Sequence, residues 1–159
     1  MSQVVLITGA SSGIGKSIAE FLVTKSFIVY GTSRNPKNEL VNGVHFLALD
    51  VTQGETVNAA VAAVLAKESR IDVLINNAVY VRGQDPLAIS DEEWQQSIDG
   101  ALNSVYRCIR EVTPHFDKAG VGKVINISSM YGMVSPDFSV YEESPAFLNP
   151  PHYGAAKAG

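Results

Sequence analysis

Short, almost continuously apolar runs alternate along this chain with longer amphipathic segments. The apolar runs are rich in β-branched residues, as expected of strands buried on both faces of a sheet. The predicted strands are Val4–Thr8, Phe27–Thr32, Val44–Leu49, Ile71–Asn76 and Lys123–Ser128. The predicted helices are Gly13–Lys25, Glu55–Lys67 and Asp91–Lys118, and a last one opens near Pro151. This alternation predicts an α/β fold with a doubly wound parallel sheet and right-handed crossovers.

Sheets of this kind bind their ligands outside the carboxyl ends of the strands. We therefore expect function in the turns that begin at Thr8, Ser33, Asp50, Asn76 and Ser128.

Size and composition narrow the class of protein. The 159 residues, 46% of them hydrophobic, suffice for one domain over 1–159 with a real core. A net charge of -4 argues against nucleic acid as a partner. No apolar run approaches the ~18 residues of a membrane span, and the first residues have no basic leader, so we expect a cytoplasmic protein. The single Cys108 fits a reducing compartment and reads as a buried structural thiol, and no metal site is predicted.

A glycine-rich turn joins the first predicted strand to the first predicted helix. Glycines let the backbone approach a pyrophosphate, and free N–H groups at a helix start attract its charge. The spacing is G-x-x-x-G-x-G, and the alternative is a purely structural turn. The strand–turn–helix context favours nucleotide binding. The candidate residues are Gly9, Ser11, Ser12, Gly13, Ile14 and Gly15.

The second predicted strand runs into Ser33 and Arg34. A site that prefers NAD usually places an acidic residue here, which would repel a 2′-phosphate. A hydroxyl and a guanidinium suit that phosphate instead, although Arg34 could also be a solvated surface residue. The pair predicts NADP(H), with NADPH preferred over NADH.

Tyr153 and Lys157 lie four residues apart in the last predicted helix. Residues at this spacing share one helix face. An ammonium beside a phenol favours the phenolate, which makes the phenol a better proton donor and acceptor. The alternative is a packed ring beside a solvated amine.

Taken together, these motifs resemble those of the short-chain dehydrogenase/reductase family over the whole chain. The other matching segments are Asp50-Val51-Thr52, Asn76-Asn77-Ala78 and Ser128-Ser129. The resemblance implies a single NAD(P)-binding Rossmann-type domain. It also implies the site residues: Asp50 and Val51 at the adenine, Asn77 and Ala78 along the cofactor path, Lys157 on the nicotinamide ribose, Ser129 on the substrate carbonyl and Tyr153 as the proton donor.

Two single positions depart from the family pattern. Val79 stands where the family has glycine, so the backbone there should avoid positive φ, without loss of cofactor binding. Ala101 stands where the family has a helix asparagine associated with a water relay to the lysine. Asn103 is about 200° further around the helix and cannot substitute without a change of register.

The segment between Ser129 and Tyr153 is longer than is usual in the family. It is rich in proline and resembles the corresponding segment of family members encoded among surface-polysaccharide genes. This resemblance implies a sugar derivative as one candidate substrate. We expect Phe138, Tyr141 and Phe147 to pack this segment onto the domain. His152 is expected to cap the helix or to be solvated, and the alternative is a contact with substrate.

Compared with the family, the sheet should be incomplete, with about five strands and without the C-terminal strands and helices. Lys123–Ser128 would then form an open edge. The leading hypothesis is an NADP(H)-dependent oxidoreductase that transfers a hydride between nicotinamide and an alcohol or carbonyl substrate. We expect a homo-oligomer. The alternative is a truncated, non-catalytic nucleotide-binding or interaction module.

Overall fold

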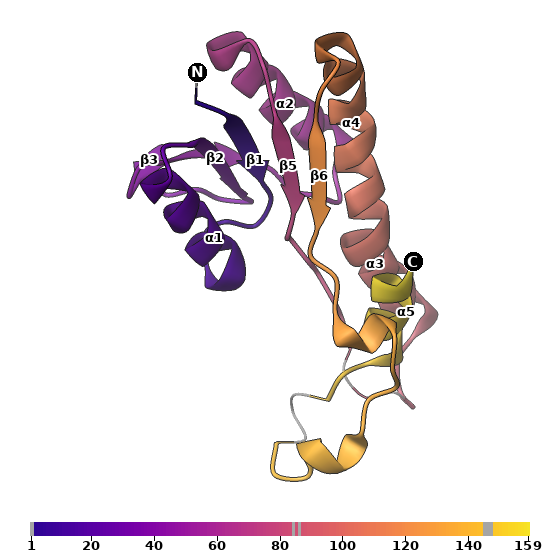
Figure 1. The fold of residues 1–159 in the computed structure, drawn as a ribbon. Coiled ribbons are helices and arrows are strands. Elements are labelled where there is room, and N and C mark those ends of the chain that lie inside the picture. The colour runs from indigo at the N-terminus through magenta and orange to yellow at the C-terminus, as the bar shows by residue number, and fades with distance from the viewer. Residues whose placement is uncertain (1, 84, 86, 145–147) are drawn as a thin grey trace. The chain divides into compact units, whose positions relative to one another are not determined.

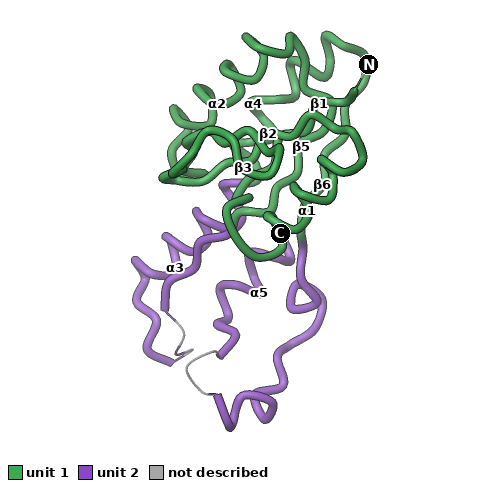
Figure 2. The backbone as a smooth tube through the Cα atoms, turned by 90° about the vertical axis from the view of Figure 1, so that its left-hand side faces the viewer, with its two compact units in different colours: residues 1–78, 105–127 green, residues 79–104, 128–159 purple. Residues whose placement is uncertain are grey.

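The computed structural model describes residues 2–83, 85, 87–144 and 148–159. Two compact units, coloured separately in Figure 2, make up the chain: residues 1–78 with 105–127 (unit 1), and residues 79–104 with 128–159 (unit 2). The single domain over 1–159 stays a prediction. Within the described residues, every helix is too short or too polar to cross a membrane.

Unit 1 contains a six-stranded sheet with the order β3-β4-β2-β1-β5-β6 (Figure 1). The strands are β1 (Val4–Ile7), β2 (Ile28–Ser33), β3 (Leu40–Val41), β4 (Val44–Ala48), β5 (Val73–Asn76) and β6 (Lys123–Asn126). All neighbours pair in parallel except β3 and β4. The predicted α/β fold with a doubly wound parallel sheet is confirmed. β6 lies at an edge, with Val124 and Ile125 exposed, as the sequence predicts.

The short strand β3 is absent from the sequence prediction. It pairs antiparallel with β4 through a turn at Asn42 and Gly43, whose φ angles are 51° and 82°. Two successive residues with positive φ are typical of a two-residue hairpin turn, and Asn-Gly is its usual sequence. This dipeptide could have revealed the hairpin.

Helices cover both faces of the sheet of unit 1. They are α1 (Gly13–Thr24), α2 (Gly54–Glu68) and α4 (Ser104–Ala119). Val5 and Ile7 of β1 pack in the cluster that includes α1, and Val4 and Leu6 pack in the cluster that includes α2 and α4. Alternate residues of a strand point to opposite faces, so an apolar run such as β1 fits only a strand covered on both sides.

Cys108, a residue of α4, points into the core, where burial raises the pKa of its thiol to about 12. This confirms the predicted buried thiol.

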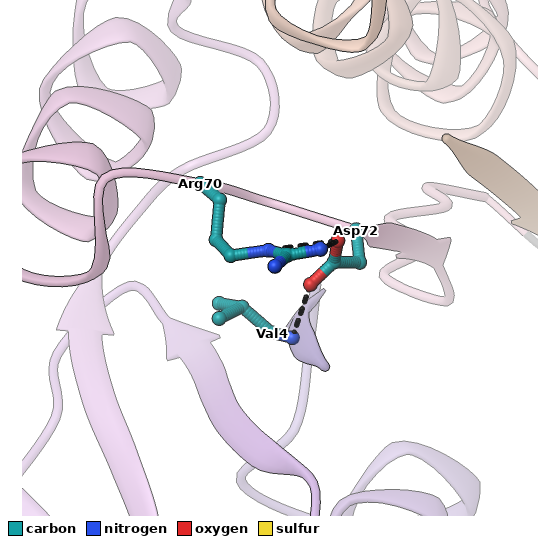
Figure 3. Close-up of polar contacts among 3 residues, drawn as sticks. All are labelled: Val4, Arg70 and Asp72. Atoms are coloured by element: carbon teal, nitrogen blue, oxygen red, sulfur yellow. Dashed lines mark hydrogen bonds and ion pairs between the residues drawn. The ribbon is translucent and has the colours of Figure 1, made fainter. Parts of the chain in front are cut away.

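Asp72, at the start of β5, ties the sheet together at the end opposite the predicted ligand site (Figure 3). Its Oδ2 accepts a 2.7 Å hydrogen bond from the backbone N–H of Val4, and its Oδ1 accepts bonds from Nε and Nη2 of Arg70. A buried carboxylate is stable only when it is paired and hydrogen-bonded. Asp72 meets this condition and joins β5 to the start of β1.

The described residues of unit 2 contain five helical elements. They are α3 (Asp91–Ile98), the π-helical turn η1 (Asp99–Asn103), the 3-10 turns η2 (Met130–Gly132) and η3 (Phe138–Tyr141), and α5 (Pro151–Ala158). The predicted helix over Asp91–Lys118 is present, since the chain is helical from Asp91 to Ala119, but the π turn η1 divides it into α3 and α4. In η1 the N–H of Ser104 donates to the carbonyl of Asp99, five residues back. The carbonyl of Gly100 instead accepts from the N–H of Tyr80 and from the Ser104 hydroxyl.

The π turn changes the register of the helix by about one residue, which is half of the shift that Asn103 would need to replace the family asparagine. Asn103 does not take that place, because its exposed side chain donates to Oδ1 of Asp99 at 3.1 Å. Ala101 is buried. A π turn is rare and frequently lies at a functional site.

We predict that Ser69→Gly stabilises the chain. Ser69 ends α2 in the left-handed conformation, with a φ of 60° and an exposed side chain. Glycine adopts this conformation without the Cβ clash that serine suffers, and we expect a gain of about 0.5–1 kcal/mol in the free energy of unfolding. Urea denaturation measures it. Ser17→Gly, in the middle of α1, is the control and should destabilise by a similar amount; a loss of stability in Ser69→Gly would contradict the prediction.

Candidate cofactor site and active site

In unit 1 the loop from β1 to α1 is built around two glycines. Gly9 has a φ of 70°, and a Cβ there would lie 2.9 Å from Cα of Ala78. A Cβ on Gly15 would lie 2.3 Å from the carbonyl oxygen of Gly9 and 2.4 Å from Nδ2 of Asn77. Only glycine fits either position, and the loop therefore closes tightly over the carboxyl end of the sheet.

Asn77 and Thr8 hold this loop in place. Nδ2 of Asn77 donates to the carbonyls of Thr8 and Gly9, at 2.9 and 3.0 Å. The Thr8 hydroxyl accepts the backbone N–H groups of Asn77 and Ala78, both at 3.0 Å. The contribution of Thr8 was missed from the sequence. These bonds make Asn77 a brace for the loop, and its predicted place along the cofactor path stays a prediction.

The start of α1 is open. Ser12 is the N-cap residue, its backbone is extended, and its side chain makes no capping bond. Ser11, Ser12, Gly13 and Ile14 are all exposed. The N–H groups of a first helical turn have no partner within the helix, so an uncapped start can bind an anion.

A cavity of about 550 Å³ lies between the start of α1 and the β3–β4 hairpin. Ser33 and Arg34 line it, as do two lysines that the sequence prediction missed, Lys16 and Lys37. Lys16 pairs with Glu20 at 3.9 Å. The buried Ser33 hydroxyl has no hydrogen-bond partner among the described residues. An unsatisfied hydroxyl beside several cations fits a negatively charged oxygen-rich group.

Asp50 and Val51 follow β4. Oδ1 of Asp50 accepts the N–H and the hydroxyl of Thr52, at 2.9 and 2.7 Å, and so shapes the turn. Val51 packs into the core with α2. Their contact with adenine stays a prediction. The φ angle of Val79 is not positive, as the sequence predicts.

In unit 2, Ser129, Tyr153 and Lys157 are all half-buried. Nζ of Lys157 lies 5.8 Å from the centroid of the Tyr153 ring, within the usual range of a cation–π contact. Partial burial lowers the pKa of the Lys157 ammonium. Ser129 caps η2, and its Oγ accepts the N–H of Tyr131 at 3.2 Å.

The two segments that carry these residues pack closely, backbone against backbone. η2 lies against α5, and the Ser128 hydroxyl donates to the carbonyl of Lys157 at 3.3 Å. A Cβ on Gly132 would lie 2.5 Å from that same carbonyl oxygen, and one on Gly154 would lie 2.9 Å from the carbonyl oxygen of Tyr131. The sequence prediction missed both glycines, whose lack of a side chain allows this approach. Unit 2 thus brings together the candidate catalytic residues.

Tyr141 connects the long segment after Ser129 to Tyr131 of η2. The hydroxyls of Tyr131 and Tyr141 lie 2.8 Å apart. Phe138 is 48% exposed, so it packs on the domain only in part; Phe147 lies outside the described residues.

The expectation that His152 caps the helix or is solvated is wrong, because its side chain is fully buried. The described residues contain no group of three His, Cys, Asp or Glu side chains that could hold a metal ion.

Comparison with known proteins identifies relatives over the whole chain. A family model described as short chain dehydrogenase matches residues 3–159. The 3-ketodihydrosphingosine reductase of Bacteroides thetaiotaomicron is 40% identical over 146 residues, which are 91% of this chain and 54% of the relative. The 3-oxoacyl-(acyl-carrier-protein) reductase FabG of Vibrio harveyi is 31% identical over 163 residues, 99% of this chain and 62% of the relative.

A solved structure has the same fold over almost the whole of this chain. The structure of ElxO with NADP bound matches with a TM-score of 0.84 and 28% identity, and covers 99% of this chain and 63% of that one. The chain therefore spans between about half and two thirds of the length of the proteins that it matches. These relatives give no support to the resemblance to members encoded among surface-polysaccharide genes.

Proposed function

Since this chain belongs to the short-chain dehydrogenase family, we propose that it acts as an NADP(H)-dependent oxidoreductase on an alcohol or carbonyl substrate. The observation that carries the proposal is the close packing of η2, which follows Ser129, against α5, which bears Tyr153 and Lys157. That packing brings a hydroxyl, a phenol and an ammonium into one unit, as acid–base chemistry at a carbonyl oxygen requires.

The residues of unit 1 fit the cofactor. The open start of α1 and the glycine cradle suit a pyrophosphate, and the unsatisfied Ser33 hydroxyl beside Arg34 suits a 2′-phosphate. When bound, the cofactor would supply the hydride. The residues proposed to hold it are Gly9, Ser11, Ser12, Gly13, Ile14, Gly15, Ser33, Arg34, Asp50, Val51, Asn77, Ala78, Tyr153 and Lys157.

The proposed chemistry follows from the hydrogen bonds of the site. Oγ of Ser129 accepts from Tyr131, which leaves its own hydrogen free to donate to a substrate carbonyl. Oη of Tyr153 would give its proton to that oxygen as negative charge develops. The Lys157 ammonium beside the ring favours the phenolate that results.

We propose a 3-oxo compound with an aliphatic chain as substrate class. Two relatives are named as reductases of such compounds. In addition, Met130, Met133 and Val134, which lie within five residues after Ser129, are exposed apolar side chains. A sugar derivative remains a candidate. A panel of 3-oxoacyl thioesters and keto sugars, followed by the absorbance of NADPH, tests both classes, and no turnover with any of them would contradict the proposal.

We predict that Arg34 decides the cofactor preference. Arg34→Ala should weaken NADPH binding about 10- to 100-fold, because a charge-assisted bond to a phosphate contributes about 1.5–3 kcal/mol, and should leave NADH binding unchanged. Fluorescence titration with both cofactors measures this. Arg110→Ala, on the exposed side of α4, is the matched control. Equal affinity of the unaltered chain for NADPH and NADH would refute the preference.

The second candidate is a non-catalytic nucleotide-binding module, which Ala101 favours because the family asparagine is lost. Tight NADPH binding without turnover of any carbonyl in the panel would support it. Self-association and a cytoplasmic location stay predictions; sedimentation equilibrium tests the first.

A further inference from the structure

His152 is the second residue of α5 and immediately precedes Tyr153. Its side chain is fully buried. The ring meets the indole of Trp94 in α3 edge to face, with the ring centroids 6.0 Å apart and the planes at 74°. His152 thus forms the aromatic contact between α5 and α3, while Tyr153 follows it on the next face of the same helix.

The burial of the ring favours its neutral form. Neither ring nitrogen has a hydrogen-bond partner among the described residues. The charged and polar groups that act on the ring are the Glu93 carboxylate of α3 and the backbone of Arg82. Burial outweighs both, so the pKa of His152 lies below its usual range. The Glu93 carboxylate already accepts hydrogen bonds from the backbone N–H and the hydroxyl of Ser90, in a capping box at the start of α3.

The other elements packed on α5 carry the titratable residues Asp99 in η1 and Tyr131 in η2. On the η2 side the contact is made by backbone: the Lys157 carbonyl accepts from Ser128, and Gly132 and Gly154 allow the close approach. α5 therefore contacts η2 through its backbone and α3 through the His152 ring. A shift of the ring would move Tyr153 and Lys157 together, since they share one short helix.

We propose that His152 is a positioning residue of the active site: its neutral ring holds α5 against α3, and protonation of the ring releases this contact. The proposal rests on the proposed function for its effect on catalysis. The contact between α5 and α3 is independent of that function.

The direction of the pH effect follows from burial. The unfolded chain binds a proton on this imidazole near pH ~6.5, and the folded chain binds it only at lower pH. The contact contributes its full stability above pH ~6.5. It is lost progressively as the pH falls below that value toward the lowered pKa of the folded state.

Trp94 is the only tryptophan of the chain, so its fluorescence reports on this contact. A protonated imidazole quenches a neighbouring indole. We expect a step in emission with a midpoint below pH ~6.5 that His152→Phe removes. His115→Gln is the matched control and should keep the step. A step of the same size and midpoint in His152→Phe would overturn the proposal.

Hydrogen exchange then shows whether the helix is released. In the unaltered chain, amides of α5 should exchange about tenfold faster at pH 5.5 than at pH 7.5, after correction for the intrinsic pH dependence of exchange. In His152→Phe the corrected rates at the two pH values should be equal. Equal protection at both pH values in the unaltered chain would overturn the proposal. This arm needs no substrate, so it decides the role of His152 even if no carbonyl compound is reduced and the proposed function fails.

Steady-state kinetics of His152 variants distinguishes a positioning role of the ring from a general role in folding. His152→Ala should lower kcat about 100-fold, because a displacement of about 1 Å at a reacting group has that effect. NADPH binding should fall by much less, because the residues proposed to hold its phosphates lie in unit 1. His152→Phe, which keeps a ring of similar size, should recover most of kcat at pH 7.5 and keep it at pH 5.5. An unchanged kcat in His152→Ala, or a parallel loss of NADPH binding, would overturn the positioning role.

Discussion

Replacing Tyr153 by phenylalanine is expected to lower kcat for carbonyl reduction about 100- to 10,000-fold, the usual contribution of a positioned general acid. Phenylalanine keeps the ring that lies 5.8 Å from Nζ of Lys157, and removes only the hydroxyl that would carry the proton. Binding of NADPH should change much less than kcat, because the residues proposed to hold its phosphates belong to unit 1. Steady-state kinetics with the best substrate of the panel, together with a cofactor titration, measures both effects.

A second tyrosine of the same unit provides the control. Tyr141→Phe removes a hydroxyl that bonds to Tyr131, so it should loosen the long segment and raise KM more than it lowers kcat. Unchanged turnover in Tyr153→Phe would remove the phenol from the mechanism. A loss of NADPH binding as large as the loss of kcat would point to misfolding of the chain.

Gly15→Ala is expected to weaken NADPH binding about 100-fold or more. The added Cβ would lie 2.3 Å from the Gly9 carbonyl oxygen and 2.4 Å from Nδ2 of Asn77, and real Cβ atoms essentially never approach so closely. The loop must open, and Asn77 must release one or both carbonyls. Two or more charge-assisted bonds to the pyrophosphate would then be lost, each contributing about 1.5–3 kcal/mol. Fluorescence titration with NADPH measures the loss.

Gly54→Ala is the matched control for this substitution. Gly54 begins α2 without positive φ, and a Cβ there would meet only the Arg110 side chain, at 3.9 Å. Alanine favours a helix over glycine, so this variant should bind NADPH normally and be slightly more stable. Circular dichroism distinguishes a local defect in Gly15→Ala from general unfolding. Normal cofactor affinity in Gly15→Ala would show that the loop adapts, and would refute the tight cradle.

Several features of the cofactor loop were predictable because they depend on neighbours in sequence. A glycine-rich turn between a buried strand and a helix predicts the open helix start that the structure contains. Arg34, at the end of β2, was predictable in the same way. Lys37 lines the same cavity together with residues of the β3–β4 hairpin, which was not predicted from the sequence.

The candidate active site shows the opposite case. Sequence spacing alone put Tyr153 and Lys157 on one helix face, but gave no reason to single out Gly132 or Gly154. Their importance depends on the approach of two backbones, η2 and α5, that are about twenty residues apart in sequence. The same holds for Asn77, whose amide bonds to a loop almost seventy residues earlier.

The sequence by itself determined the order of strands and helices and the turns that carry the candidate site residues. These features follow from local periodicity and from the freedom of glycine, which each segment expresses on its own. Only the tertiary structure decided that a π turn interrupts the long helix and that Asn103 bonds to Asp99 without replacing Ala101. It also decided that His152 is buried against Trp94. The physical reason is that burial and hydrogen-bond partners are set by residues distant in sequence, which no local pattern specifies.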